Sequence, residues 1–413
     1  MNFSEELAWR GFKNQTTLSS DTELDKNNFV FYFGVDPSAD SMQVGNLASM
    51  MMVKHFIKHG HKAILLVGGA TGMIGDPGGK NEERNLQPIE VINKNKLSIV
   101  EQYKQVLGEL SFQTVDNYDW YKNMSVLEYL RDIGKHFSMT QLLDRDYIST
   151  RIGEGGSGIS YAEFSYTILQ GYDFLYLHRK FNVSLQLCGS DQWGNCVSGV
   201  DLIRKVTGKQ THIWSCPLIT NKQTGKKFGK SEGGAIWLSE AKTSVYAFYQ
   251  FWLNTDDESV GDYLKIFTMI NPDEFNQLMD EFNNNRSSRS AQKFLAFEVT
   301  KTVHGKERAE KVSRISDVIF GQGSYSDLNN DDFEILKSEI KSITINPEIS
   351  LEDILVKSEL AESKSQARNF IQSNAIYLNG LKINDQSIQQ SDLIHGFAVL
   401  RRGKNTLALV EFE

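Results

Sequence analysis

A strand, a helix and a second strand follow one another within residues 29–67, and this succession sets the fold class. Residues 29–33 and 63–67 are short apolar runs of the kind found in buried strands. Residues 47–59 between them carry apolar side chains at helical spacing, and Gly60 provides a C-terminal stop. Two strands connected through a helix lie parallel in one sheet. The pattern therefore predicts an α/β fold built on a parallel sheet.

Further segments follow this unit along the chain. Residues 184–187 predict a third strand, and residues 88–160 indicate a helical insertion. The polar segment 321–350 is rich in Asn, Asp and Ser, which is typical of a linker. At roughly 100–200 residues per domain, a chain of this length has several domains. We expect a parallel-sheet domain over 1–235, an α-helical domain over 236–320, the linker over 321–350 and a small α+β domain over 351–413.

The small C-terminal domain has its own pattern. Residues 362–372 predict a helix, and Asn379-Gly380 within residues 376–383 is a hairpin signal. A second ribbon runs over residues 397–412 and has a basic tip.

Composition excludes several classes of protein. The chain has 413 residues, 44 Lys and Arg against 52 Asp and Glu, and a net charge of −8, so a global basic footprint for nucleic acid is absent. Three cysteines without a C-x-x-C pair predict neither a disulfide framework nor a zinc site, and the histidines at 55, 59 and 61 lack metal-site spacing. No apolar run reaches the ~18 residues of a membrane span, and no leader pattern opens the chain. We expect a cytoplasmic protein that binds no metal through its own side chains.

The glycine-dense segment 68–80 follows the second strand directly. It therefore lies at the carboxyl end of a strand, where ligands bind in open α/β sheets. Neither this segment nor residues 225–231 has the spacing of a dinucleotide fingerprint or a P-loop. Both offer backbone that a ligand can approach closely and lysines suited to phosphate. A solvated turn is the alternative for either segment alone.

A helix predicted over residues 161–177 carries an unusual polar stripe. Glu163, Tyr166, Gln170 and Asp173 are spaced by 3, 4 and 3 residues and share one face. Tyr, Gln and Asp are short, directional hydrogen-bonding side chains, whereas a solvated face usually carries Lys, Arg and Glu. The stripe indicates the wall of a polar pocket, with an ordinary exposed face as the alternative.

Taken together, these motifs resemble the bacterial-type tyrosyl-tRNA synthetases, a family of class I aminoacyl-tRNA synthetases. Residues 227–231 (Lys-Phe-Gly-Lys-Ser) look like the family's mobile signature loop, and residues 351–413 resemble an S4 RNA-binding domain. The resemblance covers nearly the whole chain and implies a Rossmann-like catalytic domain over 1–235. Its anchors are residues 32–46, 68–80, 135–138, 163–175, 189–195 and 227–231.

The resemblance implies that tyrosine is activated with ATP, accompanied by Mg²⁺, and then transferred to the 3′-terminal adenosine of tRNA(Tyr). Tyr32 and Asp173 would hydrogen-bond the phenolic hydroxyl of L-tyrosine, while Asp76, Tyr166 and Gln170 would hold its ammonium group. The implied ATP contacts are Asp36, Ser38, Gly45, Gly189, Asp191, Ser231, Lys80 and Arg84. The implied catalytic residues are Lys227, Lys230, Gln43, Asn46 and Gln192.

Two departures from the family pattern affect the nucleotide side. The first signature usually has two histidines, and this chain has Gln43-Val44-Gly45-Asn46. An amide still donates a hydrogen bond, but a cationic imidazolium is lost. Phe33 stands where the family usually has Cys, which removes a side-chain contact to the ribose.

The resemblance also implies partners. We expect a homodimer formed through the catalytic domain, and no membrane association. Tryptophanyl-tRNA synthetase is the related alternative, and a non-catalytic or specialised RNA-binding paralogue is the alternative of another class. The predicted phosphate contacts of the C-terminal domain are Lys364, Arg368, Arg401, Arg402 and Lys404.

Overall fold

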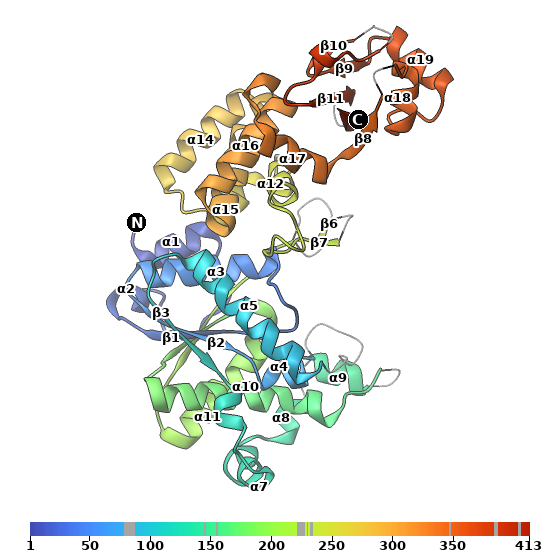
Figure 1. Ribbon diagram of the computed structural model, residues 1–413. Coiled ribbons are helices and arrows are strands. Elements are labelled where there is room, and N and C mark those ends of the chain that lie inside the picture. Colours follow the sequence, from blue (N-terminus) through green and yellow to red (C-terminus); the bar gives the residue numbers. More distant parts are fainter. Residues whose placement is uncertain are drawn as a thin grey trace. The chain divides into compact units, whose positions relative to one another are not determined.

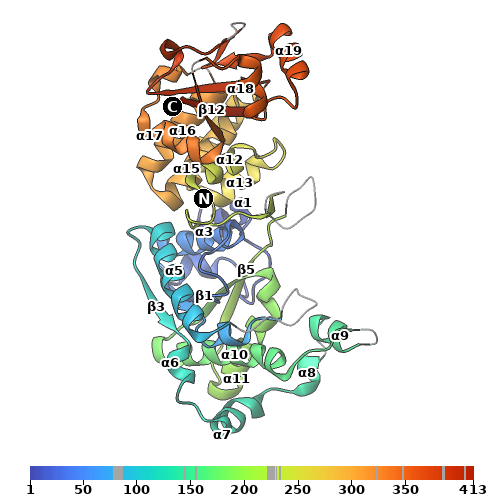
Figure 2. The ribbon, with the colours of Figure 1, turned by 45° about the vertical axis from the view of Figure 1, so that its right-hand side comes forward.

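The computed structural model describes residues 1–77, 87–143, 146–153, 156–220, 228, 230–231, 234–321, 323–346, 348–383, 387–403 and 406–413. The chain forms two compact units. The first unit contains residues 1–243 and 255–291, and the second unit contains residues 244–254 and 292–413 (Figures 1 and 2). Within the described residues, no helix has the length and apolarity needed to cross a membrane.

The first unit is built on a five-stranded sheet in the order β3-β2-β1-β4-β5, in which every neighbouring pair is parallel. The parallel α/β fold is therefore confirmed. The strands are β1 (Val30–Val35), β2 (Lys62–Val67), β3 (Phe112–Asp116), β4 (Leu185–Gly189) and β5 (His212–Cys216).

Helices cover both faces of this sheet, and successive side chains of β1 pack on them in turn. Phe31 packs on Phe56 of α3 (Val44–Lys58), with ring centroids 5.5 Å apart. The next residue, Tyr32, points to the opposite face and packs on Phe174 of α10 (Tyr161–Phe181) at 5.1 Å. A strand buried on both faces has a continuous apolar run in its sequence, and this run is why β1 could be predicted.

The order of the strands places a crevice between β1 and β4. The chain passes from β1 outward to β2 and β3, and then crosses to the other side for β4 and β5. At such a switch point the loops that follow neighbouring strands diverge, and ligands bind in the space between them. The segments after β1, β2 and β4 are therefore the candidates for the functional site.

Other helices and short strands of the first unit surround the sheet. α5 (Ile89–Leu107) contacts α3 and β2, and α11 (Trp193–Thr207) packs along α10. The remaining elements are α1 (Phe3–Arg10), α2 (Glu23–Lys26), α4 (Thr71–Ile74), α6 (Tyr118–Tyr121), α7 (Val126–Glu128), η1 (Tyr129–Ile133), η2 (Gly134–His136), α8 (Met139–Leu143), α9 (Asp146–Ile152), η3 (Ser190–Gln192), β6 (Lys230–Ser231), β7 (Gly234–Ala235), α13 (Val260–Phe267), α14 (Pro272–Asn284) and η4 (Arg286–Ser288).

The sequence pattern missed two strands of the sheet. The segment 88–160, predicted to be helical, contains β3, and β5 was not identified. β3 is an edge strand with no fully buried residue, so it lacks the apolar run that marks β1 and β2. The prediction of a purely helical insertion is therefore wrong at residues 112–116.

The second unit combines helices with a mixed sheet in the order β10-β9-β11-β12-β8. Its hairpin between β9 and β10 forms at Asn379-Gly380, and both residues have positive φ (45° and 81°), as a tight hairpin turn requires. The elements are α12 (Val245–Leu253), α15 (Ser290–His304), α16 (Lys306–Phe320), η5 (Tyr325–Asp327), α17 (Asn330–Glu339), β8 (Lys341–Ile345), α18 (Leu351–Lys357), α19 (Lys364–Gln372), β9 (Ile376–Leu378), β10 (Leu381–Lys382), η6 (Gln390–Asp392), β11 (Phe397–Arg402) and β12 (Thr406–Phe412).

Two predicted boundaries differ from the structure. Residues 321–350, predicted to be a linker, contain α17 and β8, and β8 pairs in parallel with β12. This edge strand alternates buried and half-exposed residues, so its composition is as polar as that of a linker. Residues 255–291, assigned from the sequence to the helical domain, belong to the first unit.

A buried ion pair joins α9 to the start of α10. The Arg151 guanidinium donates to both carboxylate oxygens of Glu163 at 3.0 Å, and the two side chains are only 7% and 2% exposed. Glu163 also accepts from the backbone N–H of Ser160 at the start of α10. Glu163 shares a helix face with Asp173, as predicted, but its carboxylate is occupied by Arg151.

Replacing Glu163 by Gln should destabilise the fold strongly, because it leaves the Arg151 charge buried and uncompensated. We expect a loss of about 3–5 kcal/mol in the free energy of unfolding, measured by urea denaturation. The matched control is Asp132→Asn, which breaks the ion pair between the exposed side chains of Arg131 and Asp132. Equal unfolding midpoints for the two variants would contradict the structural role of the buried pair.

Candidate active site

The polar side chains at the switch point come from elements far apart in the sequence. Asp36 follows β1, and Gly189 ends β4 on the other side of the crevice. On the next strand, Gly68 follows β2 and leads into α4. From the helix packed across this edge, Tyr166 and Asp173 project with their side chains buried.

Tyr32 and Asp173 occupy the buried end of the site. The Tyr32 side chain is 2% exposed, and its hydroxyl has no hydrogen-bond partner among the described residues. Burial raises the pKa of this hydroxyl well above its ordinary value, and the nearby Cys196 and Asp173 raise it further. A buried hydroxyl without a partner costs free energy, so this group is suited to a polar ligand.

Asp173 is held by two hydrogen bonds from the segment that follows β3. Asn117 Nδ2 donates to Asp173 Oδ2 at 3.1 Å, and Trp120 Nε1 donates to Oδ1 at 2.9 Å. Burial raises the pKa of Asp173 to about 7, although these two bonds and one with Tyr121 act to lower it. The other ionisable groups whose charges interact with Asp173 are Asp36, Tyr32, Tyr121, Tyr166 and Tyr172.

Asp36 lies at the centre of a second set of hydrogen bonds. Tyr166 Oη donates to Asp36 Oδ2 at 2.7 Å, and Thr71 Oγ1 donates to Oδ1 at 2.6 Å. Asp76 accepts from Gln192 Nε2 at 2.5 Å, across the crevice from β4. The structure thus brings Asp36 together with Tyr166, and Asp76 together with Gln192.

Gln170 and Gln186 add two more unpartnered atoms beside these groups. Gln170 Nε2 donates weakly to Cys196 Sγ at 3.8 Å, while its Oε1 is buried without a partner among the described residues. Gln186 is the register partner of Tyr32 in the parallel pair β1–β4, and its Oε1 is also buried and unpartnered. Three buried polar atoms, of Tyr32, Gln170 and Gln186, are therefore available for hydrogen bonding.

The start of α3 forms the opposite part of the site. Asn46 Oδ1 accepts from the backbone N–H of Gln43 at 3.0 Å, so the Asn46 side chain caps its own helix. A β-bridge joins Gln43 to Trp237, and the N–H of Val44 donates to the carbonyl of Ile236. Phe228, from the predicted signature loop, is anchored by packing on Tyr263. The chain on the C-terminal side of this loop is therefore tied to the N-terminus of α3, whereas Phe228 is tied to α13.

Several predicted residues lie at the rim of the site or outside the described part of the chain. Ser38 and Asp191 are exposed, and Gly45 is half-exposed. Lys80, Arg84, Lys227 and Lys404 lie outside the described residues, as do the side chains of Lys230 and Ser231.

Three residues of the site were missed by sequence reasoning. Asn117 and Trp120 follow β3, and this strand was not predicted, so nothing placed them at the same edge of the sheet. Thr71 belongs to the predicted glycine-dense loop, but its hydroxyl carried no distinguishing pattern. An assignment of β3 would have indicated Asn117, because it follows the strand at its carboxyl end.

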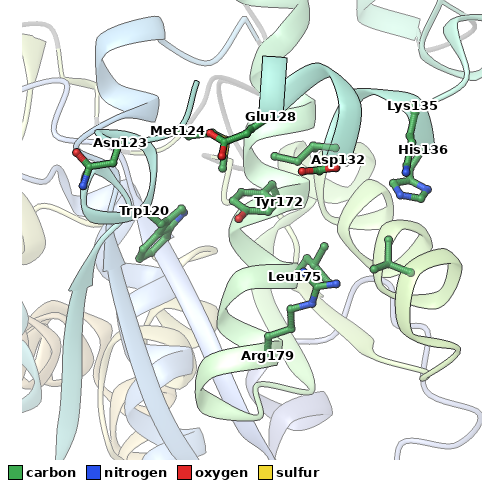
Figure 3. A pocket seen from close by; sticks show the side chains of 12 residues that line it. Trp120, Asn123, Met124, Glu128, Asp132, Lys135, His136, Tyr172, Leu175 and Arg179 are labelled. Atoms are coloured by element: carbon green, nitrogen blue, oxygen red, sulfur yellow. The ribbon is translucent and has the colours of Figure 1, made fainter. Parts of the chain in front are cut away.

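A cavity of about 570 Å³ is lined on one side by Trp120 (Figure 3). Tyr172 and Arg179 of α10 and Lys135 of η2 also line it. Trp120 therefore lines this cavity and also donates its indole N–H to Asp173. The groups predicted to bind a ligand do not line this cavity.

A parallel sheet whose switch point gathers carboxylates beside the N-terminus of a helix is typical of α/β enzymes that bind nucleotides. Residues 24–321 match the family described as tRNA synthetases class I (W and Y), and the chain belongs to this family. Residues 332–410 match the tyrosine–tRNA ligase SYY-like C-terminal domain. This second match begins within the predicted linker, in agreement with the position of β8.

Curated relatives narrow the family further. The chain is 42% identical over 418 residues to the tyrosine–tRNA ligase of Lactococcus lactis subsp. lactis (strain IL1403), covering 98% of each chain. It is 43% identical to the tyrosine–tRNA ligase of Escherichia fergusonii, covering 99% of this chain and 98% of the relative.

Solved structures agree with this assignment. A C-terminally truncated Aspergillus nidulans mitochondrial tyrosyl-tRNA synthetase has a TM-score of 0.68 and 30% identity, covering 76% of this chain and 92% of the other. A tryptophanyl-tRNA synthetase from Encephalitozoon cuniculi shares the fold at a TM-score of 0.54 and 14% identity, covering 76% of this chain and 89% of the other.

The raised pKa of Asp173 predicts a pH-dependent stability. Its ordinary value is 3.8 and its value in the fold is about 7, so the folded chain favours the protonated carboxyl. That stabilisation is fully present below about pH 4 and is lost as the pH rises through 7. Asp173→Asn removes this titration. Between pH 4 and 8 the unfolding free energy of the wild type should therefore fall by about 4 kcal/mol relative to that of the variant. Parallel pH profiles in urea denaturation would contradict the assignment.

Proposed function

We propose that this chain is a tyrosine–tRNA ligase. In the first step a carboxylate oxygen of tyrosine attacks the α-phosphorus of ATP, and the bond to the leaving pyrophosphate breaks. In the second step the terminal ribose hydroxyl of tRNA(Tyr) attacks the carbonyl carbon of the tyrosyl-adenylate, and AMP leaves. The observation that carries the proposal is the buried pair of Tyr32 and Asp173 in a chain that matches tyrosine–tRNA ligases over its whole length.

The pair recognises the substrate by its phenolic hydroxyl. The Asp173 carboxylate accepts a hydrogen bond from the phenolic O–H, while the Tyr32 hydroxyl donates a hydrogen bond to the phenolic oxygen. Phenylalanine would leave the Tyr32 hydroxyl and the Asp173 carboxylate each without the hydrogen bond to the ligand, at a cost of roughly 1–3 kcal/mol for each group. This cost arises only if water is excluded, and both side chains are 2% exposed.

The other end of the amino acid lies toward Asp76. This carboxylate, with Tyr166 and Gln170, binds the ammonium group. Gln170 supports this role because its buried Oε1 lacks a partner among the described residues and can accept an N–H from the ligand. Gln192, which donates to Asp76, lies next to the reacting carboxylate.

ATP binds along the opposite edge, with Mg²⁺ arriving as part of the nucleotide substrate. Its phosphates face the N-terminus of α3, where Gly45 allows a close approach of the ligand to the backbone. Asp36, Ser38, Gly189 and Asp191 surround the nucleoside, and Gln43 and Asn46 lie beside the phosphates. We assign Lys227, Lys230, Ser231, Lys80 and Arg84 to the pyrophosphate by resemblance.

The test is ATP–pyrophosphate exchange measured in parallel with tyrosine, phenylalanine and tryptophan. We expect exchange with tyrosine and a kcat/KM at least a hundredfold lower with phenylalanine. The Tyr32 hydroxyl and the Asp173 carboxylate each lose a hydrogen bond to the ligand, and each loss lowers kcat/KM by about one order of magnitude. Exchange with tryptophan instead would identify the sister enzyme. Absence of exchange with all three amino acids would indicate an RNA-binding paralogue without the chemistry.

The partner in the second step is tRNA(Tyr), and we assign its contacts to basic side chains of residues 351–413. Lys364 is paired with Asp353, and Arg368 with Glu352, so their charges are partly neutralised. Arg401 instead lies over the ring of Tyr377, and its Nε is buried without a partner among the described residues. Arginine beside a half-buried aromatic ring is suited to RNA, where it contacts phosphate while a base stacks.

Of the predicted RNA contacts, Arg401 should therefore contribute most. Arg401→Ala should lower kcat/KM for tRNA charging about tenfold, because a charge-assisted hydrogen bond is lost. It should also reduce the slope of log affinity against log salt by about one. Pyrophosphate exchange by the same variant is the internal control and should be unchanged. A charging rate equal to that of the wild type would remove Arg401 from the interface.

We also propose a homodimer through the catalytic unit, in the cytoplasm. Several exposed apolar side chains lie between residues 126 and 161 of the insertion, and exposed apolar surface supports association. They are Val126, Leu127, Leu130, Met139, Leu143, Ile152 and Tyr161.

A further inference from the structure

The hydroxyl of Thr71 lies between the two halves of the candidate site. Its side chain is buried at 2% exposure, on the short helix α4 that follows β2. Thr71 Oγ1 donates to Asp36 Oδ1 at 2.6 Å and accepts from Asn117 Nδ2 at 2.9 Å. One hydroxyl therefore contacts both a carboxylate of the nucleotide side and a residue of the phenol side.

Asn117 carries this contact on to Asp173. It is fully buried, and its Nδ2 group donates to both Thr71 Oγ1 and Asp173 Oδ2. Its Oδ1 accepts from the backbone N–H of Ala70 at 2.7 Å, so the orientation of the amide is fixed. Because Asn117 can only donate toward Thr71, the single Thr71 proton must point to Asp36. Hydrogen bonds aligned in one direction polarise and strengthen one another.

The backbone leaves room for this chain of contacts at one position. A Cβ atom at Gly68 would lie 2.0 Å from Asp36 Oδ1 and 2.3 Å from Thr71 Oγ1. No side chain fits at such distances, so a glycine after β2 is required for Asp36 and Thr71 to meet.

We propose that Thr71 is a positioning residue that sets the Asp173 carboxylate through Asn117 and the Asp36 carboxylate directly. The inference rests on the proposed function, in which Asp173 accepts a hydrogen bond from the phenolic hydroxyl of tyrosine. Thr71 itself contacts neither tyrosine nor ATP. Its role is to make recognition of the amino acid and of the nucleotide depend on one buried hydroxyl.

Loss of the hydroxyl should affect the two substrates differently. In Thr71→Val, one N–H of Asn117 has no acceptor, so the amide can turn away from Asp173. The Asp173 carboxylate is then held less firmly in the position that accepts the phenolic hydroxyl. Asp36 loses a donor at the same time, which weakens the nucleotide side. Phenylalanine has no hydroxyl to bond with Asp173, so the kcat/KM for phenylalanine should not change in this variant.

The experiment is pyrophosphate exchange by the full chain carrying Thr71→Val, Thr71→Ser or Thr71→Ala. At saturating ATP we expect Thr71→Val to raise the KM for tyrosine about tenfold and to leave kcat/KM for phenylalanine within about twofold. The KM for ATP should rise with either amino acid. Thr71→Ser keeps the oxygen and should restore tyrosine recognition, whereas Thr71→Ala should behave like Thr71→Val.

Thr268→Val is the matched control, because it also removes a buried threonine hydroxyl of the first unit. That hydroxyl donates to the carbonyl of Leu264, at the end of α13. We expect its kinetic constants to match those of the wild type. Thermal unfolding of each variant identifies any chain that fails to fold, and Thr71→Ser then decides between a lost oxygen and a lost shape.

Equal losses with tyrosine and phenylalanine would overturn the inference, since they would show a general structural role. Unchanged constants in both Thr71→Val and Thr71→Ala would also overturn it. Failure of the unsubstituted chain to exchange with tyrosine would overturn the proposed function itself, and it is recognised because no variant is involved.

Discussion

The burial of Asp173 is the constraint on which the arrangement of the site depends. A carboxylate at the interface between a sheet and a helix needs hydrogen-bond donors, and here they come from Asn117 and Trp120 beyond β3. Those donors fix the loop after β3 against α10. Through Thr71 and Asp36, the same network reaches the loops after β2 and β1. Four segments separated along the chain are thus held by one set of polar contacts.

This network is not optimal for stability. The pKa of Asp173 is raised to about 7, so its ionised form is disfavoured by the surroundings, and the hydroxyl of Tyr32 is buried without a partner among the described residues. Apolar side chains at these two positions would cost the fold less. Their retention is understandable if the missing hydrogen bonds are completed by a ligand, since a polar group that is prearranged and desolvated discriminates more sharply than a solvated one.

The sequence identified those parts of the fold that are recorded in local patterns. β1, β2 and β4 are apolar runs, and the stripe on α10 follows from helical periodicity, so Tyr166, Gln170 and Asp173 were placed on one face. Periodicity does not identify the partner of a side chain, and Glu163 on the same stripe pairs with Arg151. β3 and β8 are edge strands with few buried residues, and such strands resemble loops in composition. Asn117 was missed for the same reason, because its place in the site depends on β3.

The altered first signature has a structural consequence at the nucleotide side. In this chain Asn46 Oδ1 accepts from the Gln43 N–H, so the third residue of the helix caps its first turn. One backbone donor is thereby satisfied within the helix instead of facing outward. The backbone N–H of Val44 donates to the carbonyl of Ile236, which follows the predicted signature loop. The ring of Phe228, within that loop, packs on Tyr263. Under the proposed function, charge for the phosphates comes from the lysines assigned to pyrophosphate and not from the start of α3, where Gln43 and Asn46 carry neutral amides.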